Sequence, residues 1–276
     1  MFEFFITTKC NYKCSHCFLS CSSRGEHMPE DVFERGKELM VESSEYPLIL
    51  GGEPTLHPLF NRYVLNLFDA VEEGGGFVEI ASNGSFIYDV NRRSKVAEVL
   101  KTAATNTKNK TVHLSVSGDR YHMRFWKSPE HIGLIRQWLT DSGLSGLPQL
   151  TFGVNSRADN GVNPVGRAKR NYLPGGFVSE IMGKASCVMS HMQDEDDDDI
   201  SDAYDEFLIF PDGQFSTCRH ALVKIGNIME LDNAGVRDRI RSFAEAARSR
   251  QPQCGKCAHT FADFRTNSNC RLKLAA

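Results

Sequence analysis

The sequence has no long hydrophobic run. Its N-terminus reads MFEFFITTKC, and this apolar stretch is far too short for the hydrophobic part of a signal peptide or for a transmembrane helix. With no export signal, we expect a cytoplasmic protein without a membrane partner, in a compartment where thiols stay reduced. The 9 cysteines are therefore expected to bind metal or to take part in chemistry rather than to form disulfides.

An excess of positive charge is also missing. Lys and Arg together number 32 against 35 for Asp and Glu, which gives a formal net charge of -3. A protein that binds the backbone of nucleic acid normally carries a basic stripe, so we expect no nucleic-acid partner. The composition, 41% hydrophobic and 24% charged, is typical of an ordinary globular protein without internal repeats or dominant disorder. At 276 residues the chain can bury one large core, or one large and one small.

Short apolar runs alternate with helical patterns along the first part of the chain. Five such runs predict strands at residues 2–8, 46–54, 77–84, 111–118 and 149–155. Helical patterns lie between them, at 30–40, 59–73, 92–104 and 128–143. In the last helix, Ser128 is the expected N-cap and Gly143 lies beyond the end. This alternation predicts an α/β fold with a parallel sheet and helices outside it.

Polar and glycine residues recur directly after the predicted strands. They are Cys10, Gly51–Glu53, Ser82–Gly84, Ser117–Asp119 and Asn155. In α/β barrels the active site lies at the carboxyl ends of the strands. We therefore expect a barrel, complete or partial, with these residues at one mouth.

The pattern changes after about residue 175. Cysteines return at Cys187, Cys218, Cys254, Cys257 and Cys270. A hairpin is predicted to turn at Asp212–Gly213, and an amphipathic helix follows from about residue 233. We expect a small second domain over residues 179–276, after a first domain over 1–178, with bound metal supporting its slight core. The acidic run at 194–199 fits a solvated loop or, alternatively, a docking surface for a basic peptide.

Three cysteines stand close together after the first predicted strand, at Cys10, Cys14 and Cys17. A structural zinc site usually takes four ligands as two separated pairs, so the fourth ligand would have to be Cys21, His16 or a distant residue. A [4Fe–4S] cluster can instead be held at three irons by three thiolates. The fourth iron is then free to bind a reactant.

The spacing C-x3-C-x2-C after the first strand, together with GGEP at 51–54 after the second, resembles the signature of the radical S-adenosylmethionine (SAM) enzymes. The resemblance spans about residues 1–175 and implies a partial (β/α)6 TIM-like barrel. It implies a [4Fe–4S] cluster on Cys10, Cys14 and Cys17 whose open iron is chelated by SAM. One electron, from a flavodoxin- or ferredoxin-type donor, cleaves the sulfonium in this family. The resulting 5′-deoxyadenosyl radical then removes a hydrogen atom from the substrate.

The resemblance also assigns SAM contacts residue by residue. It places Gly51, Gly52, Glu53 and Pro54 at the methionyl amino group, and Ser82, Asn83, Ser115 and Ser117 near the ribose and amino acid portion. Asn155 and Arg157 would reach the ribose and carboxylate, and His16 the adenine. The alternative for Ser82, Asn83, Ser115 and Asn155 is that they merely end strands. The catalytic candidates are Asp119, His122 and Cys21. The alternative for His122 is an ordinary histidine of a surface loop, and the alternative for Cys21 is a small buried residue without a catalytic role.

The later cysteines resemble the C-terminal SPASM and twitch extensions of radical SAM enzymes, which bind auxiliary [4Fe–4S] clusters. We expect one auxiliary cluster on Cys187, Cys218, Cys254 and Cys257. Cys270 is an alternative ligand, because Cys254, Cys257 and Cys270 also resemble the three-cysteine auxiliary site of the molybdenum-cofactor cyclase. A structural zinc site on the same residues is a further alternative.

Two substrate classes follow from the resemblance, and peptide modification is preferred because much of the SPASM and twitch group matures peptides by crosslinking, oxidation or epimerisation. The second is dehydrogenation of a small metabolite such as an amino sugar alcohol. The start of the chain at its first strand, with no room for a peptide-recognition domain, favours this second reading. A zinc-binding module without enzymatic activity is a third hypothesis, against which GGEP and the polar strand ends argue.

Overall fold

The computed structural model describes residues 1–43, 45–71, 76–106, 109–156, 167, 207–217 and 224–248, with the side chains of the last segment described to residue 243. Several predicted features lie outside these residues: Arg157, the acidic run at 194–199, and Cys187, Cys218, Cys254, Cys257 and Cys270. The auxiliary cluster therefore stays a prediction. Within the described part of the chain, none of the helices is long and apolar enough to cross a membrane.

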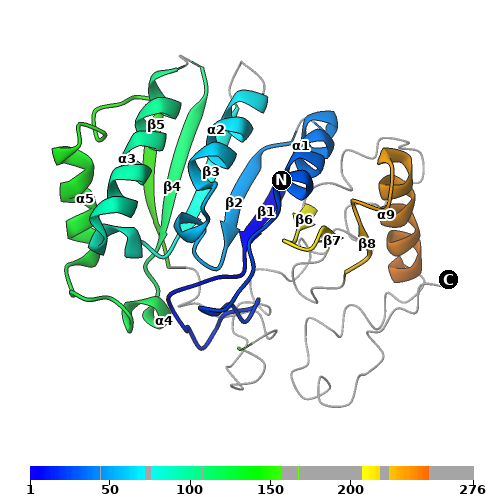
Figure 1. Ribbon diagram of the computed structural model, residues 1–276, viewed down its shortest axis with the longest axis horizontal. Coiled ribbons are helices and arrows are strands. Elements are labelled where there is room, and N and C mark those ends of the chain that lie inside the picture. The colour runs from blue at the N-terminus through cyan, green and yellow to red at the C-terminus, as the bar shows by residue number, and fades with distance from the viewer. Residues whose placement is uncertain are drawn as a thin grey trace.

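The described strands form one mostly parallel sheet in the order β5-β4-β3-β2-β1-β6-β7-β8 (Figure 1). Their bounds are β1 (Phe2–Thr7), β2 (Pro47–Gly51), β3 (Phe77–Ser82), β4 (Thr111–Ser117), β5 (Leu150–Asn155), β6 (Phe207–Ile209), β7 (Gln214–Ser216) and β8 (Gly226–Asn227). Neighbours from β5 to β6 run parallel, and β6, β7 and β8 pair antiparallel. The α/β class and the five predicted strands are confirmed. The six-unit barrel stays a prediction.

Helices connect the parallel strands. They are α1 (Glu30–Ser43), α2 (Phe60–Ala70), α3 (Val90–Thr105), α4 (Arg120–Met123) and α5 (His131–Asp141), with α9 (Asn233–Arg248) later in the chain and 3-10 turns η1 (Pro54–Leu56) and η2 (Ser85–Tyr88). Figure 1 shows α1, α2 and α3 side by side over one face of the sheet. The four helices predicted between strands are confirmed, whereas the short α4 was not predicted.

The predicted cap of α5 is wrong. The helix begins at His131 with Glu130 at the N-cap position, and the Glu130 side chain makes no capping hydrogen bond. Ser128 acts one step earlier, because its Oγ accepts the backbone N–H of Glu130 at 3.1 Å and its carbonyl accepts that of His131 at 3.2 Å. The serine therefore forms a turn that leads into the helix. Gly143 does end the helix as predicted, with a φ of +67° that favours glycine.

The core lies between the sheet and its covering helices. Alternate residues of β1, namely Phe2, Phe4 and Ile6, are fully buried in this layer. Phe33 of α1 stacks on Tyr63 of α2 with ring centroids 3.8 Å apart and an interplanar angle of 1°. Each fully buried aromatic or aliphatic side chain contributes about 1.5–3 kcal/mol relative to an exposed one. This packing holds the strands in register, so their carboxyl ends share one edge of the sheet.

The predicted hairpin is confirmed and extends the same sheet. Strands β6 and β7 pair antiparallel around a turn at Asp212–Gly213, where Gly213 has a φ of +76°. Strand β6 also pairs parallel with β1, and the rings of Phe2 and Phe207 lie 4.7 Å apart. In Figure 1 the yellow hairpin accordingly continues the sheet next to β1. The domain boundary predicted at residue 178 lies outside the described residues.

Candidate active site

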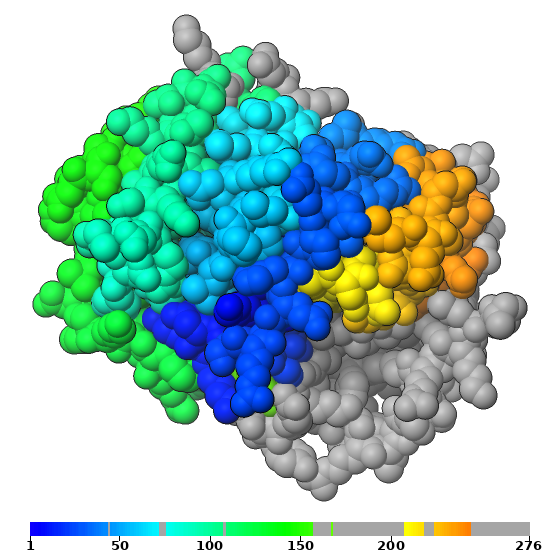
Figure 2. Space-filling model, in the orientation of Figure 1, coloured from blue at the N-terminus to red at the C-terminus, as the bar shows by residue number. Residues whose placement is uncertain are grey.

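A loop that follows β1 carries the three clustered cysteines. It closes on itself where the backbone N–H of Cys10 donates to the carbonyl of Ser22 at 2.8 Å, and that of Ser22 donates to the carbonyl of Thr8 at 3.1 Å. Figure 2 shows this blue N-terminal part of the chain at the surface, between the green residues near α4 and the yellow β6–β7 hairpin. We call residues 8–22 the cysteine loop. Its closure holds Cys10, Cys14 and Cys17 in one small volume.

Cys10 and Cys14 are buried, and the thiols of this loop are close enough to affect one another. Cys10 and Cys14 are 8% and 4% exposed, and the backbone N–H of Tyr12 donates to Cys10 Sγ at 3.3 Å. Burial raises the pKa of Cys10 to about 12, and burial followed by the charges of Cys10 and Cys17 raises the pKa of Cys14. The thiolates of Cys10 and Cys14 are therefore favoured only beside a positive charge, which bound metal supplies. The donor set fits a metal centre.

Cys21 lies directly against Cys17. It is 2% exposed, and its backbone N–H donates to Cys17 Sγ at 3.3 Å. A hydrogen bond from the Cys21 thiol lowers the pKa of Cys17 to about 6, and the same contact is the main reason that the pKa of Cys21 is raised. Cys21 therefore supports the sulfur of Cys17. Its predicted catalytic role stays a prediction.

The GGEP segment contacts the cysteine loop through its backbone. The N–H of Gly52 donates to the carbonyl of Thr7 at 2.7 Å, and the N–H of Glu53 donates to the carbonyl of Lys9 at 2.9 Å. A Cβ atom on Gly52 would lie 2.2 Å from the Lys9 oxygen, and Gly51 has a φ of +143°. Glycine is required at both positions because no side chain fits between the end of β2 and the loop.

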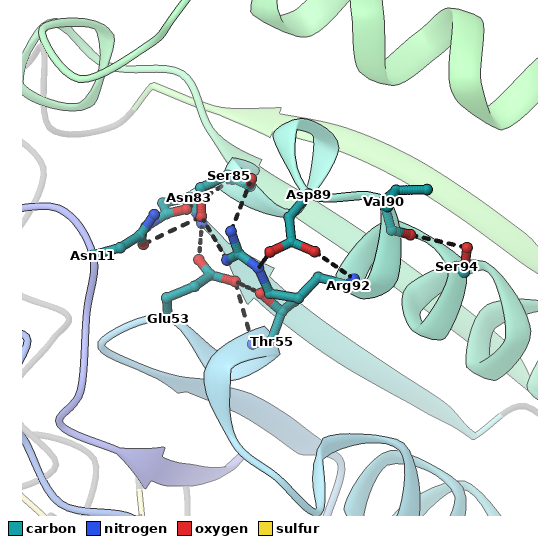
Figure 3. Close-up of polar contacts among 9 residues, drawn as sticks. All are labelled: Asn11, Glu53, Thr55, Asn83, Ser85, Asp89, Val90, Arg92 and Ser94. Carbon is teal, nitrogen blue, oxygen red and sulfur yellow. Dashed lines mark hydrogen bonds and ion pairs between the residues drawn. The ribbon is translucent and has the colours of Figure 1, made fainter.

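The carboxylate of Glu53 is buried and hydrogen-bonded to the ends of β2 and β3 (Figure 3). Its Oε1 accepts the hydroxyls of Thr55 at 2.6 Å and Ser82 at 2.8 Å, and also the N–H of Thr55 at 3.3 Å. Its Oε2 accepts the backbone N–H of Asn83 at 2.7 Å. An ionised carboxylate has about four acceptor positions, so Oε2 has room for a further donor such as an ammonium group. Pro54, also predicted here, is buried and opens η1.

The Asn83 side chain joins the end of β3 to the cysteine loop, as Figure 3 shows in part. Its Nδ2 donates to Asn11 Oδ1 at 3.0 Å and approaches Cys10 Sγ at 3.7 Å. The hydroxyl of Ser85 also donates to Asn11 Oδ1, at 3.2 Å, and accepts from Arg92 Nη1 at 3.3 Å. Asn11, Ser85 and Arg92 were not predicted. For Asn11, the position directly after the first cysteine was the available signal.

Asp119 and two histidines meet beside Cys14. Asp119 caps α4 by accepting the backbone N–H groups of Tyr121 and His122, and its Oδ2 lies 2.6 Å from His122 Nδ1 and 4.0 Å from His16 Nε2. Burial alone would raise the pKa of Asp119, but the hydrogen bond from His122 and the charges of both histidines lower it overall. His16 stacks on Tyr121 at 4.6 Å. Ligand atoms of Cys14, His16 and His122 all lie within 4.8 Å of one another.

The remaining predicted contacts lie on β4 and β5. Leu114 and Val116 of β4 belong to the core beneath the helices, so Ser115 and Ser117 face the opposite side of the sheet. Ser115 is 6% exposed, and Ser117 pairs with Asn155 at the carboxyl end of β5. These residues share the edge that carries the cysteine loop. Their contact with SAM stays a prediction.

Arg167 is a residue of this site that the sequence did not reveal. Its Nε donates to the carbonyl of Cys14 at 2.8 Å, its Nη1 donates to that of Cys21 at 2.6 Å, and its backbone N–H donates to that of Cys17 at 2.9 Å. About 150 residues separate it from the loop, and no motif surrounds it. Only the folded chain brings the two together.

Comparisons with known proteins agree with this geometry. Residues 4–128 match the family model described as the radical SAM superfamily. A segment of 80 residues is 36% identical to an S-adenosylmethionine-dependent nucleotide dehydratase of Thermoplasmatales archaeon (strain ISO4-H5). That match covers 29% of this chain and 27% of the relative, so the chain matches about a quarter of the relative's length.

Among solved structures, the chain is similar in fold to BtrN in complex with AdoMet and 2-DOIA, with a TM-score of 0.55 at 15% identity over 89% of this chain and 85% of that one. Streptococcus suis SuiB bound to S-adenosylmethionine gives a TM-score of 0.42 at 13% identity, over 84% and 63% of the two chains. The segment that matches the family model contains both the cysteine loop and the GGEP segment. The radical SAM family implies a [4Fe–4S] cluster and SAM as its cofactors.

Proposed function

We propose that this chain, whose residues 4–128 match the radical SAM model, is an enzyme that cleaves SAM reductively and removes a hydrogen atom from a substrate. One observation carries the proposal: the cysteine loop and the GGEP segment are hydrogen-bonded to each other. Glu53 N–H meets the Lys9 carbonyl at 2.9 Å, directly before Cys10. The residues that would hold the cluster and those that would hold SAM are thus adjacent parts of one unit.

In this proposal Cys10, Cys14 and Cys17 hold a [4Fe–4S] cluster. When bound, the cluster supplies the electron that cleaves SAM to a 5′-deoxyadenosyl radical, and that radical abstracts the substrate hydrogen. Burial of Cys10 and Cys14 limits the access of water to their sulfur atoms. The backbone N–H of Cys21 donates to the sulfur of Cys17 at 3.3 Å.

Glu53 has the clearest task among the SAM-binding candidates. Its carboxylate keeps a fixed orientation because Thr55, Ser82 and Asn83 all donate to it. Oε2 would then accept a hydrogen bond from the ammonium group of SAM, and burial would strengthen this charged hydrogen bond. Asn83 joins Glu53 to Cys10 and so orients SAM relative to the cluster ligands.

His122 is proposed as the group that takes or gives a substrate proton, with Asp119 as its orienting partner. The Asp119 carboxylate at 2.6 Å holds the proton on His122 Nδ1, so Nε2 is the atom available to accept one. His16, stacked on Tyr121 in the same cluster, is proposed to contact the adenine. Ser115, Ser117, Asn155 and Arg157 are proposed as further SAM contacts.

The substrate class is proposed from two sources. The name of the relative that is 36% identical over 80 residues favours a small molecule, specifically a nucleotide. The resemblance of the later cysteines to SPASM and twitch extensions favours a peptide. Candidate nucleotides or a candidate peptide, deuterated at carbon, would be incubated with unlabelled SAM, and deuterium recovered in 5′-deoxyadenosine would identify the class.

The auxiliary cluster on Cys187, Cys218, Cys254 and Cys257, with Cys270 as the alternative ligand, is also a proposal. Iron analysis of anaerobically prepared protein tests it, because two clusters give about eight irons per chain and one gives about four. Cys257→Ala should lose about half of the iron and retain some SAM cleavage. Colourless protein that contains zinc would contradict both clusters.

The central experiment measures 5′-deoxyadenosine. Protein prepared without oxygen would be mixed with SAM and dithionite, with methionine and 5′-deoxyadenosine followed by chromatography. We expect both products in equal amounts. Protein with a full complement of iron that forms neither product would overturn the proposed function.

A further inference from the structure

Two halves of the cysteine loop are held by different parts of the chain. The half with Cys10 is tied to β2 and β3, through the Lys9–Glu53 backbone bond and the approach of Asn83 to Cys10. The half with Cys14, Cys17 and Cys21 is tied to Arg167, which donates one hydrogen bond to each of their three carbonyls. Arg167 therefore fastens the part of the loop that carries two of the three cluster ligands.

The shape of the guanidinium suits this task. Its Nε and Nη1 reach two carbonyls that are seven residues apart in sequence, at 2.8 and 2.6 Å. Lysine offers a single ammonium group on a flexible stem and cannot span two acceptors in the same fixed geometry. Removal of the side chain would leave the carbonyls of Cys14 and Cys21 without these donors.

The charge of Arg167 acts on the sulfurs as well. Its guanidinium lies against this half of the loop, since Nε and Nη1 reach the carbonyls of Cys14 and Cys21 at 2.8 and 2.6 Å. A permanent positive charge beside thiolates favours whichever state of the site is more negative. For a bound cluster, that is the reduced state.

We propose that Arg167 is a positioning residue that holds the Cys14–Cys21 half of the loop in its cluster-binding conformation and raises the reduction potential of the bound cluster. The inference rests on the proposed function, since it concerns the same cluster. It adds a residue outside the matched segment 4–128 that controls how firmly the cluster is held and how readily it accepts an electron.

The test compares Arg167→Gln and Arg167→Lys with Arg35→Gln. Arg35 is a matched control because it also donates to two backbone carbonyls, those of Ile228 and Leu231, away from the cysteine loop. The readouts are iron release to a chelator, the midpoint potential of the SAM-binding cluster by EPR-monitored titration, and thermal unfolding. All are made on the full chain in a Cys257→Ala background, so that one cluster is observed.

We expect Arg167→Gln to release iron about 10-fold faster or more, the usual range for loss of a supporting residue at a metal site, and to shift the potential to a more negative value. Arg167→Lys should keep the potential near that of the parent protein while still releasing iron faster. If Arg167→Gln folds poorly, the rate of iron release from Arg167→Lys still tests the inference. Arg35→Gln should match the parent protein in both cluster readouts.

Two results would overturn the inference. An Arg167→Gln protein with the parental potential and rate of iron release would do so, as would equal effects of Arg167→Gln and Arg35→Gln. A parent protein that takes up no iron would overturn the proposed function and this inference with it. An iron-loaded parent with an unaffected Arg167→Gln variant would overturn the inference alone.

Discussion

The carboxylate of Glu53 accepts a hydrogen bond of 2.7 Å from the backbone N–H of Asn83. Because Glu53 follows β2 and Asn83 follows β3, this bond joins the ends of two neighbouring strands. The Asn83 side chain then reaches Cys10 in the loop after β1. Three strand ends are thereby connected at one point, and a change at any of them should affect both metal binding and SAM binding.

Cys14→Ala should abolish SAM cleavage and lose the iron of the SAM-binding site, while any auxiliary cluster persists. Two thiolates cannot hold three irons of a cubane cluster. Iron analysis and 5′-deoxyadenosine chromatography measure the two effects. Cys21→Ala is the matched control, since Cys21 lies against Cys17 without being a proposed ligand, and it should retain iron. Retained 5′-deoxyadenosine formation in Cys14→Ala would count against the cluster assignment.

Glu53→Gln should weaken SAM binding about 10-fold or more, because a charged hydrogen bond to the ammonium group contributes about 1.5–3 kcal/mol. The amide would also point donors at groups that already donate, from Ser82 and Asn83. Equilibrium dialysis with labelled SAM measures the affinity. Glu38→Gln, at an exposed position on α1, should bind SAM as the parent protein does. Equal affinity in all three proteins would remove Glu53 from the SAM site.

Gly52→Ala should destabilise the fold by about 2 kcal/mol or more, because its Cβ would lie 2.2 Å from the Lys9 oxygen. It should also release iron faster, since the cysteine loop has to move away. Urea unfolding and a chelator assay measure these effects. Gly133→Ala on α5 meets nothing within 4 Å and should stabilise the protein by about 0.5–1 kcal/mol. A stable Gly52→Ala protein would contradict the close approach of β2 to the loop.

His57 should make stability depend on pH. Its pKa is lowered to about 4, first by burial and then by the charge of His27, against the opposing hydrogen bond to the Met28 carbonyl. Below about pH 6.5 the unfolded chain binds a proton that the folded chain refuses. Neutral His57 therefore makes its full contribution to the free energy of unfolding above pH 6.5. That contribution, on the order of 2–3 kcal/mol, is lost as the pH falls towards 4.

Urea unfolding at pH 7 and pH 4.5 checks this prediction. His57→Gln should lose less stability than the parent protein on acidification. Tyr63→Phe is the control, because the Tyr63 hydroxyl donates to the same Met28 carbonyl at 3.1 Å without titrating in this range. It should lower stability by a similar amount at both pH values. A parental pH dependence in His57→Gln would show that other groups cause it.

Local patterns predicted much of the fold because short-range rules decide them. The alternation of apolar runs placed all five parallel strands, and helical periodicity placed the helices between them. The start of α5 was misplaced because Ser128 can make the same kind of side-chain hydrogen bond in a turn as at a helix cap. In that case the sequence indicated the right interaction at the wrong position.

Spacing alone determined that Cys10, Cys14 and Cys17 would act together, since residues so close in sequence cannot lie far apart in space. Adjacency along the chain likewise determined that Gly52 and Glu53 would end a buried strand. Tertiary structure alone decided that β6 pairs with β1 and that Arg167 reaches the cysteine loop across about 150 residues. Contacts of that separation depend on how the whole core packs, and nothing in the neighbouring sequence of either partner specifies them.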